Sequence, residues 1–227
     1  EWTKLLSQPR PNGRGKGEFD MDAVREYRDV AEEARRLKRT VHFGFLDEYV
    51  FLKGSELPEN DPGRKCKGRT VFRGNQVYDQ DRAYAVFQEL SSNPSTMTAS
   101  RMCDAYGCQK GYSTKTNDAT GAYCQSYLDT SNGVITWVEI PKERWPEEWK
   151  KRGFVRPVVP MVLALYGHPD AGGFWERHCE AKIKDLGFLP IGPEWPSCFF
   201  HPEYKAMLVI YVDDFKLSAP THLQDEI

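Results

Sequence analysis

The sequence lacks the patterns that mark several large protein classes. No apolar run among its 227 residues approaches the ~18 residues of a membrane-spanning helix, and no signal-peptide pattern stands at its start. We therefore expect an intracellular protein that does not interact with a membrane. The six cysteines form no Cys-x-x-Cys pair, which argues against structural zinc and favours free thiols in a reducing compartment.

A global basic charge is also missing. The formal net charge is −2, so the chain as a whole has no electrostatic signature of a nucleic-acid-binding protein. Basic residues nevertheless gather in two places, each of which is either a solvated face or the lining of a groove. They are Arg64, Lys65, Lys67, Arg69 and Arg73 in the first cluster, and Lys150, Lys151, Arg152 and Arg156 in the second.

Periodicity and turn residues predict an α+β fold in which helices flank an antiparallel sheet. Residues 1–19 are rich in Pro, Gly and basic residues, and we expect a flexible arm there. Helices are predicted over 20–38, from a cap at Ser95 to about residue 108, and over 171–186. Strands are predicted over 41–46, 49–53, 67–73, 134–140, 207–212 and 215–218.

The segment MLVIYVDDFKL, residues 207–217, places two adjacent carboxylates inside an apolar hairpin. Asp213 and Asp214 would form its turn, and Asp is common in turns because its side chain bonds the nearby backbone. Here, however, apolar residues lead directly into the acids, and crowded carboxylates repel each other unless a cation neutralises them. A hard divalent cation such as Mg²⁺ takes oxygen ligands. The segment therefore indicates either an ordinary turn or part of a metal site.

The tetrapeptide at 211–214 (YVDD) resembles the catalytic hairpin of reverse transcriptases, and its context resembles the copia-type retrotransposon branch. The resemblance runs, with gaps, from about residue 50 to residue 220, and further landmarks follow the family's order. They are KGRTVFRG at 67–74, LALYG at 163–167, FW at 174–175, DLGF at 185–188 and SCFF at 197–200.

The resemblance implies a third catalytic aspartate, which the family places before an Ala-aromatic pair. The segment DATGAY at 118–123 fits that pattern. By this analogy Asp118, Asp213 and Asp214 would be the catalytic, metal-binding residues. Tyr123 falls where the family blocks a ribose 2′-hydroxyl. Arg69 falls where the fingers contact the incoming nucleotide, with Lys67 as a second candidate.

The implied activity is RNA-directed DNA synthesis, with two Mg²⁺ ions, or Mn²⁺, as cofactors. Partners would be dNTPs and an RNA or DNA template-primer, in a cytoplasmic virus-like particle or the nucleus. Residues 20–92 would hold the N-terminal helix and first part of the fingers, 93–126 the first part of the palm, 127–168 the second part of the fingers, and 169–227 the rest of a truncated palm. The thumb and RNase H domain would belong to a longer polyprotein.

Two alternatives remain open. One is a catalytically inactive nucleic-acid-binding remnant of such an element. It is suggested by Asp170, which stands near a position where the family has a Gln that helps to hold the nucleotide, and by the early end of the chain. The other is an unrelated metal-dependent phosphotransferase or nuclease.

Overall fold

The computed structural model describes all residues except 14, 88–92, 129 and 227. Each of the predicted segments 1–19, 20–92, 127–168 and 169–227 contains some of these undescribed residues, and the predictions for those residues lie outside the described part of the chain. The chain divides into two compact units. Unit 1 comprises Glu1–Glu89 and Tyr123–Ala171, and unit 2 comprises Leu90–Ala122 and Gly172–Ile227. Each unit contains one five-stranded sheet, so the expected α+β class is confirmed.

Unit 1 is built on a mixed sheet with the strand order β1-β6-β5-β2-β3. Its β2 and β5 run parallel, and the other pairs are antiparallel. The strands are β1 (Arg25–Glu26), β2 (Val41–Lys53), β3 (Lys65–Phe72), β5 (Ile135–Glu139) and β6 (Pro157–Pro160). The helices are α1 (Trp2–Ser7), α2 (Tyr27–Leu37) and α4 (Glu147–Lys151), with 3₁₀ turns at Met21–Ala23, Tyr123–Gln125 and Lys142–Arg144.

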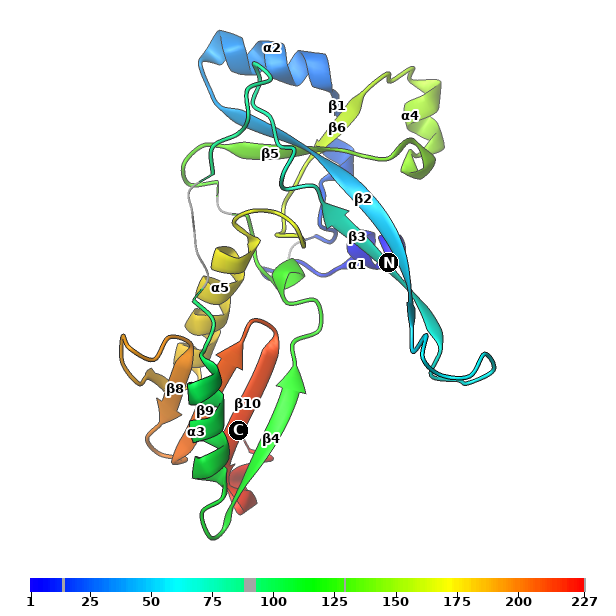
Figure 1. Ribbon diagram of the computed structural model, residues 1–227. Coiled ribbons are helices and arrows are strands. Elements are labelled where there is room, and N and C mark those ends of the chain that lie inside the picture. Colours follow the sequence, from blue (N-terminus) through cyan, green and yellow to red (C-terminus); the bar gives the residue numbers. More distant parts are fainter. Residues whose placement is uncertain (14, 88–92, 129, 227) are drawn as a thin grey trace. The chain divides into compact units, whose positions relative to one another are not determined.

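Helix α2 lies against one face of this sheet (Figure 1). Its apolar stripe includes Val30 and Ala34, which pack with Phe43 and Trp137 of the strands. The helix begins at Tyr27, later than the predicted residue 20, because Arg25 and Glu26 instead pair with β6. The Glu26 carboxylate fixes this start by accepting the Val155 and Arg156 N–H groups at 2.5 and 3.0 Å.

Strand β2 is continuous, whereas the sequence predicted two strands separated at Asp47 and Glu48. Both acids stay in register with β3. Asp47 receives two hydrogen bonds from the Arg73 guanidinium, and Glu48 pairs with Arg144 at 3.0 Å. The prediction was wrong because these ion pairs, formed with distant segments, hold the acids within an extended strand.

The first nineteen residues also differ from the expected flexible arm. They include α1, and Leu5, Glu18 and Phe19 are all buried. Leu5 and Phe19 belong to the main core of unit 1, on the other side of the sheet from α2, together with Phe72 and Val138. Burial of these apolar side chains provides the free energy that orders the segment.

Unit 2 is built on an antiparallel sheet with the order β4-β10-β9-β8-β7. The strands are β4 (Tyr112–Asp118), β7 (Leu189–Pro190), β8 (Cys198–His201), β9 (Ala206–Tyr211) and β10 (Asp214–Pro220). The helices are α3 (Met97–Gly107) and α5 (Ala171–Asp185, whose first residue belongs to unit 1), with a 3₁₀ turn at Thr221–Leu223. Among the described residues, no helix is long and apolar enough to cross a membrane.

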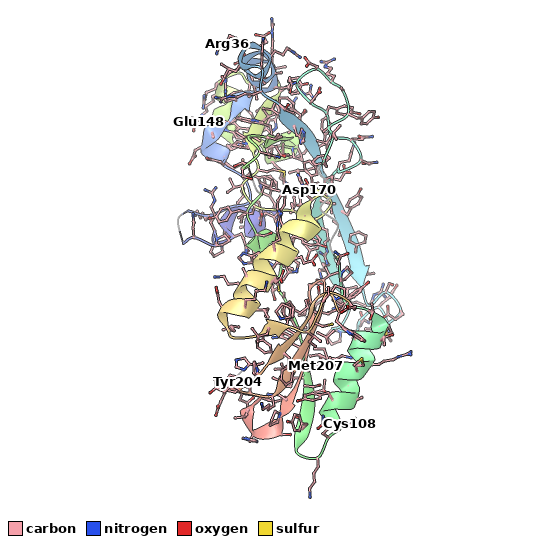
Figure 2. The ribbon with its side chains drawn as sticks, turned by 90° about the vertical axis from the view of Figure 1, so that its left-hand side faces the viewer. Arg36, Cys108, Glu148, Asp170, Tyr204 and Met207 are labelled. Atoms are coloured by element: carbon pink, nitrogen blue, oxygen red, sulfur yellow. The ribbon has the colours of Figure 1, made fainter. Side chains whose placement is uncertain are left out.

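Helix α3 packs on the sheet of unit 2 through Ala99 and Cys103, which contact Met207 and Val209. Figure 2 shows Met207 on the sheet and Cys108 at the end of this helix. The N-cap is Thr96, one residue after the predicted Ser95, and its hydroxyl accepts the Ala99 N–H at 3.1 Å. All of β9 except Tyr211 is buried, so this strand is the rigid centre of the unit.

Candidate functional site

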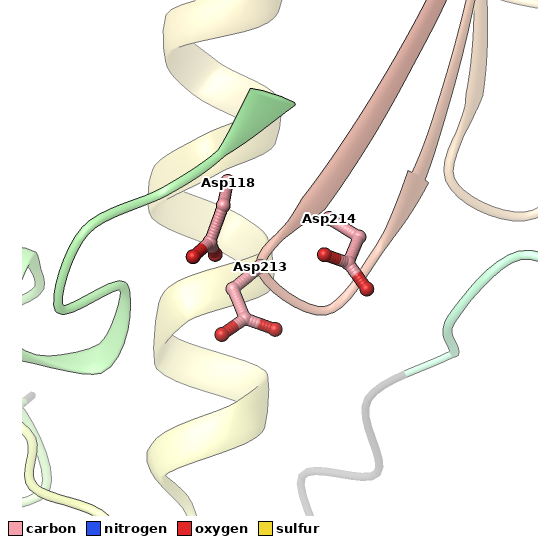
Figure 3. Close-up of side chains that lie close together, drawn as sticks. All are labelled: Asp118, Asp213 and Asp214. Carbon is pink, nitrogen blue, oxygen red and sulfur yellow. The ribbon is translucent and has the colours of Figure 1, made fainter. Parts of the chain in front are cut away.

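Three carboxylates meet at one end of the unit 2 sheet (Figure 3). Asp118 is the last residue of β4, and Asp214 is the first residue of β10 and the direct cross-strand partner of Asp118. Asp213 lies in the turn before β10, and its carbonyl oxygen accepts the Ala119 N–H at 2.7 Å. One oxygen from each carboxylate lies within 4.8 Å of the others. The pairing of β4 with β10 therefore brings residues that are distant in sequence into one cluster.

The turn that carries Asp213 differs from the predicted one. Tyr211 pairs with Asp214, so the two turn residues are Val212 and Asp213 rather than the two acids. Val212 has a φ of 58°, a conformation that costs a β-branched residue about 1–3 kcal/mol. The Trp175 indole N–H donates to the Val212 carbonyl oxygen at 2.7 Å. This hydrogen bond from α5 helps to hold the strained turn in place.

The cluster has no compensating cation in the described part of the chain. Asp118 and Asp214 are exposed and Asp213 is half-buried, and no ion pair within 4.0 Å joins any of them to a described Lys or Arg. Lys216, two residues after Asp214, instead donates to Ser100 Oγ at 2.7 Å and to Asp104 Oδ2 at 2.9 Å. Like charges on directly opposed strand positions repel, and Asp118 and Asp214 face each other in this way.

The donor set suits a hard divalent cation. Three carboxylates offer only oxygen ligands, and their exposure leaves coordination positions open to water or phosphate oxygens, as Mg²⁺ requires. Exposed acidic groups are also common without an ion, so the cluster is a candidate metal site.

A groove of about 790 Å³ opens beside the cluster, wholly within unit 2. One wall is the first turn of α3, with Thr96, Met97 and Ser100, and the other is the end of the sheet, with Tyr211 and Phe215. Asp118, Asp214 and Lys216 also line it. The carboxylates therefore stand at the edge of a space large enough for a ligand of several hundred Å³.

The predicted nucleotide-binding residues belong to unit 1, where Arg69 and Tyr123 share a neighbour. The Arg69 guanidinium lies over the Tyr166 ring, 5.0 Å from its centroid. The Tyr123 ring meets the same Tyr166 edge-on, with centroids 4.6 Å apart. Lys67 is exposed on β3, opposite Phe51 of β2. The structure thus brings Arg69 and Tyr123 together through Tyr166 and leaves Lys67 further out along the strand.

Comparison with protein-family models and with curated proteins finds no match to this chain. The family resemblance consequently depends on the short motifs and their order in the sequence.

Sequence reasoning missed three residues around these clusters. Tyr166 appeared only as part of LALYG, yet it packs between Arg69 and Tyr123. Trp175 appeared only as part of the FW motif at 174–175, although it also donates a hydrogen bond to the turn carbonyl. Lys216 could have been noticed, because strand alternation places it on the same face as Asp214. No local signal predicts the other two contacts, since each joins separate segments.

Proposed function

We propose that the chain is the fingers and palm part of an RNA-directed DNA polymerase of the copia-like type, which transfers deoxynucleotides to a primer 3′-hydroxyl. The observation that carries the proposal is the approach of Asp118, Asp213 and Asp214 to within 4.8 Å at a hairpin turn. The interleaving of the two units along the chain also supports it, because the resemblance assigns alternating segments to fingers and palm.

In this proposal Asp118, Asp213 and Asp214 hold two Mg²⁺ ions. The chemistry that bound Mg²⁺ supplies at such a site is activation of the attacking hydroxyl and stabilisation of the leaving pyrophosphate. The chain's own contribution is positioning. The strained turn and the β4–β10 pairing fix the three carboxylates, and the groove beside them admits a substrate.

The unit 1 cluster would contact the nucleotide. Arg69 has a planar guanidinium that can donate two hydrogen bonds to phosphate oxygens at once. The Tyr166 ring packs against this guanidinium and restricts its orientation. Tyr123, packed against Tyr166, would exclude a ribose 2′-hydroxyl, and Lys67 would add a second cation near the triphosphate. A Tyr123→Ala variant should therefore accept ribonucleotides more readily than the wild type.

Primer extension on an RNA template, with Mg²⁺ or Mn²⁺ and with the downstream region of the polyprotein restored, tests the proposal. We expect Asp213→Asn to lower the extension rate at least ~10³-fold, in line with the loss of a group that stabilises transition-state charge, while template binding stays within twofold. Asp225→Asn is the matched control, because Asp225 is an exposed acid of the same unit that pairs with Lys115, and it should extend normally.

Two results would contradict the proposal. Absence of extension by the wild type, together with salt-dependent template binding, would favour the inactive nucleic-acid-binding remnant. Equal extension by the wild type and Asp213→Asn would remove the carboxylate cluster from the mechanism.

A further inference from the structure

A second pocket lies within unit 1, on the face of the sheet that α2 covers. Its volume is about 290 Å³, and it contains none of the residues assigned above to metal or nucleotide binding. Four aromatic side chains and two arginines line it, namely Tyr27, Phe43, Phe45, Tyr78, Arg82 and Arg156. The pocket therefore combines flat aromatic walls with two guanidinium groups.

The aromatic walls are fixed by the fold. Tyr27 is the first residue of α2, and its ring packs 4.3 Å from that of Phe43 at an angle of 50°. Tyr78 is held beside Phe43 by two backbone hydrogen bonds of 2.7 and 3.0 Å. Phe45 follows Phe43 by two positions on β2, so strand alternation places both rings on one face. The walls are therefore formed before any ligand arrives.

Arg156 stands over these rings in a fixed position. Its guanidinium lies 4.0 Å from the centroid of Tyr27 and 5.9 Å from that of Phe45. Its Nε donates to Glu139 Oε2 at 2.6 Å, and its backbone N–H is bound by Glu26. Because Glu139 contacts Nε, the two terminal nitrogens remain able to donate to an anion. Arg156 is thus a preorganised donor at the wall of the pocket.

Arg82 is the second cation of the pocket, and its own backbone is strained. Its φ is 66°, within a tight loop in which Asp79 Oδ1 accepts the N–H groups of Asp81 and Ala83 at 2.8 and 2.9 Å. Asp81 in turn pairs with Arg35 of α2 at 2.8 Å. The nearby acids are therefore occupied, and no described acid forms an ion pair with Arg82. Positive φ at a non-glycine residue is a strain that costs about 1–3 kcal/mol, and such residues cluster at ligand-binding and active sites.

The chemistry of the lining selects the ligand class. Aromatic cages bind cations when no other charge is present, but two guanidiniums would repel a cation. Flat rings instead stack on aromatic side chains, and guanidiniums bind phosphate in a paired geometry. A volume of about 290 Å³ is at the lower end of small-molecule sites, which fits one nucleotide unit better than an oligonucleotide.

We propose that this pocket binds a nucleoside monophosphate unit, with the base against Phe43, Phe45 and Tyr78 and the phosphate between Arg82 and Arg156. The ligand is either a free nucleotide or the 5′-terminal nucleotide of a strand. The proposal does not rest on the polymerase proposal, because the pocket contains none of Asp118, Asp213 and Asp214.

Calorimetric titration of the whole chain in EDTA tests it, with AMP, adenosine, inorganic phosphate and phosphotyrosine as separate titrants. We expect AMP to bind at least about tenfold more tightly than each of the other three, because only AMP combines a nucleobase with the anion. Titration with a 5′-phosphorylated trinucleotide distinguishes a free nucleotide from the 5′ end of a strand. The unphosphorylated trinucleotide is its control. Tighter binding of the phosphorylated strand than of AMP indicates a strand end, and the reverse indicates a free nucleotide.

Arg82→Gly is the decisive variant, because glycine accepts the positive φ and the loop should stay folded. It should weaken AMP binding about tenfold and leave adenosine binding unchanged. Lys38→Gly is the matched control, since Lys38 is also an exposed cation at positive φ, at the other end of α2 from Tyr27, and it should bind AMP within twofold of the wild type. Asp213→Asn should bind AMP normally, which separates this pocket from the carboxylate cluster.

The proposal is overturned if AMP produces no binding at millimolar concentration, or if Arg82→Gly binds AMP as tightly as the wild type. Tighter binding of phosphotyrosine than of AMP would overturn the nucleotide assignment.

Discussion

Glu18 of unit 1 and the Asp118–Asp213–Asp214 cluster of unit 2 place carboxylates in opposite environments. Glu18 is a single acid with no exposed surface, and neither of its oxygens has a partner with hydrogen-bond geometry among the described residues. The three aspartates are crowded together, but two of them are exposed and the third is half-buried. Glu18 is fully buried, with Glu1 as only a minor charged neighbour, whereas the three aspartates lie close together and are largely exposed.

The difference shows that the fold tolerates crowding of acidic groups at the surface but does not tolerate a buried charge. Burial raises the pKa of Glu18 from its ordinary value of 4.5 to about 8, although the Cys124 thiol and Arg10 lower it in part. Glu18 is therefore neutral at pH 7, because the interior disfavours the charge more than its neighbours can compensate. The aspartate cluster keeps access to water, which screens repulsion between like charges. Unit 2 can thus collect charge at its surface, whereas unit 1 suppresses it inside.

The largest expected effect is the pH dependence of stability that the buried Glu18 causes. The unfolded chain releases the Glu18 proton above pH 4.5, while the folded chain keeps it until about pH 8, so stability falls as pH rises through this window. The loss is on the order of 5 kcal/mol, at 1.36 kcal/mol per pKa unit. Glu18→Gln should abolish this decline, as measured by urea unfolding followed by tryptophan fluorescence at pH 5 and pH 8.5.

Glu56→Gln is the control for this measurement, because Glu56 is an exposed acid of the same unit, and it should decline as the wild type does. A parallel decline of Glu18→Gln and the wild type would show that Glu18 is not the titrating group.

His168 should show the opposite pH dependence within the same unit. Burial, with a smaller contribution from the charge of His42, lowers the pKa of His168 from 6.5 to about 4. The ring packs against Phe72 and Phe87, and its Nδ1 accepts the Asp170 N–H at 3.2 Å. Below pH 6.5 the unfolded chain binds a proton that the folded chain refuses, so stability falls by on the order of 3 kcal/mol towards pH 4.

His168→Asn removes this titration, and the Asn side-chain oxygen can still accept the Asp170 N–H. Its unfolding free energy should be lower than that of the wild type at pH 7, because the ring packing is lost, but should change less between pH 7 and pH 4. His222→Asn, at an exposed position of unit 2, should follow the wild type. An unchanged acid slope in His168→Asn would exclude His168 as its cause.

The smallest effect concerns the exposed cluster. In EDTA, Asp118→Asn should raise the melting temperature of unit 2 slightly, by the equivalent of less than about 1 kcal/mol, because it removes a like charge opposite Asp214. Under the proposed function, addition of Mg²⁺ should then stabilise the wild type more than the variant, since only the wild type keeps all three of the proposed ligands. A lower melting temperature of Asp118→Asn in EDTA would mean that Asp118 makes contacts that outweigh the repulsion.

Local sequence patterns predicted the three longest helices and several of the strands, but not α1, α4, β1, β4, β6 or β7. The helix expected over 171–186 is present as α5, and the strand expected over 134–140 is present as β5. Gly187, two residues after the end of α5, has a φ of 92°, a conformation that favours glycine and often follows a helix. Such features depend on residues a few positions apart, so the sequence alone suffices for them.

The errors arose where distant segments compete with local preference. The break expected at Asp47 and Glu48 disappears because Arg73 and Arg144 pair with these acids. The hairpin turn moves by one residue because the register of β9 with β10, together with Trp175, fixes Val212 at positive φ. Likewise, the polar composition of β4 is explained by its place at the edge of its sheet, where most of its residues are exposed.

The candidate site was predictable in part. Motif resemblance pointed to Asp118, Asp213 and Asp214, but their approach depends on the pairing of β4 with β10. No motif indicated the arginine and aromatic pocket, because its lining comes from α2, β2, the loop around Arg82 and the residue just before β6.

The sequence by itself determined the α+β class, the positions of the longer helices and several strands, and the three aspartates as candidate cation ligands. Only the tertiary structure decided that residues 1–19 pack into a core, that Glu18 is buried and neutral, and that three aspartates meet. The physical reason is that helix and strand preferences act over neighbouring residues. Burial and clustering of charge depend instead on which remote segments come into contact, because those contacts set the access of water to each charged group.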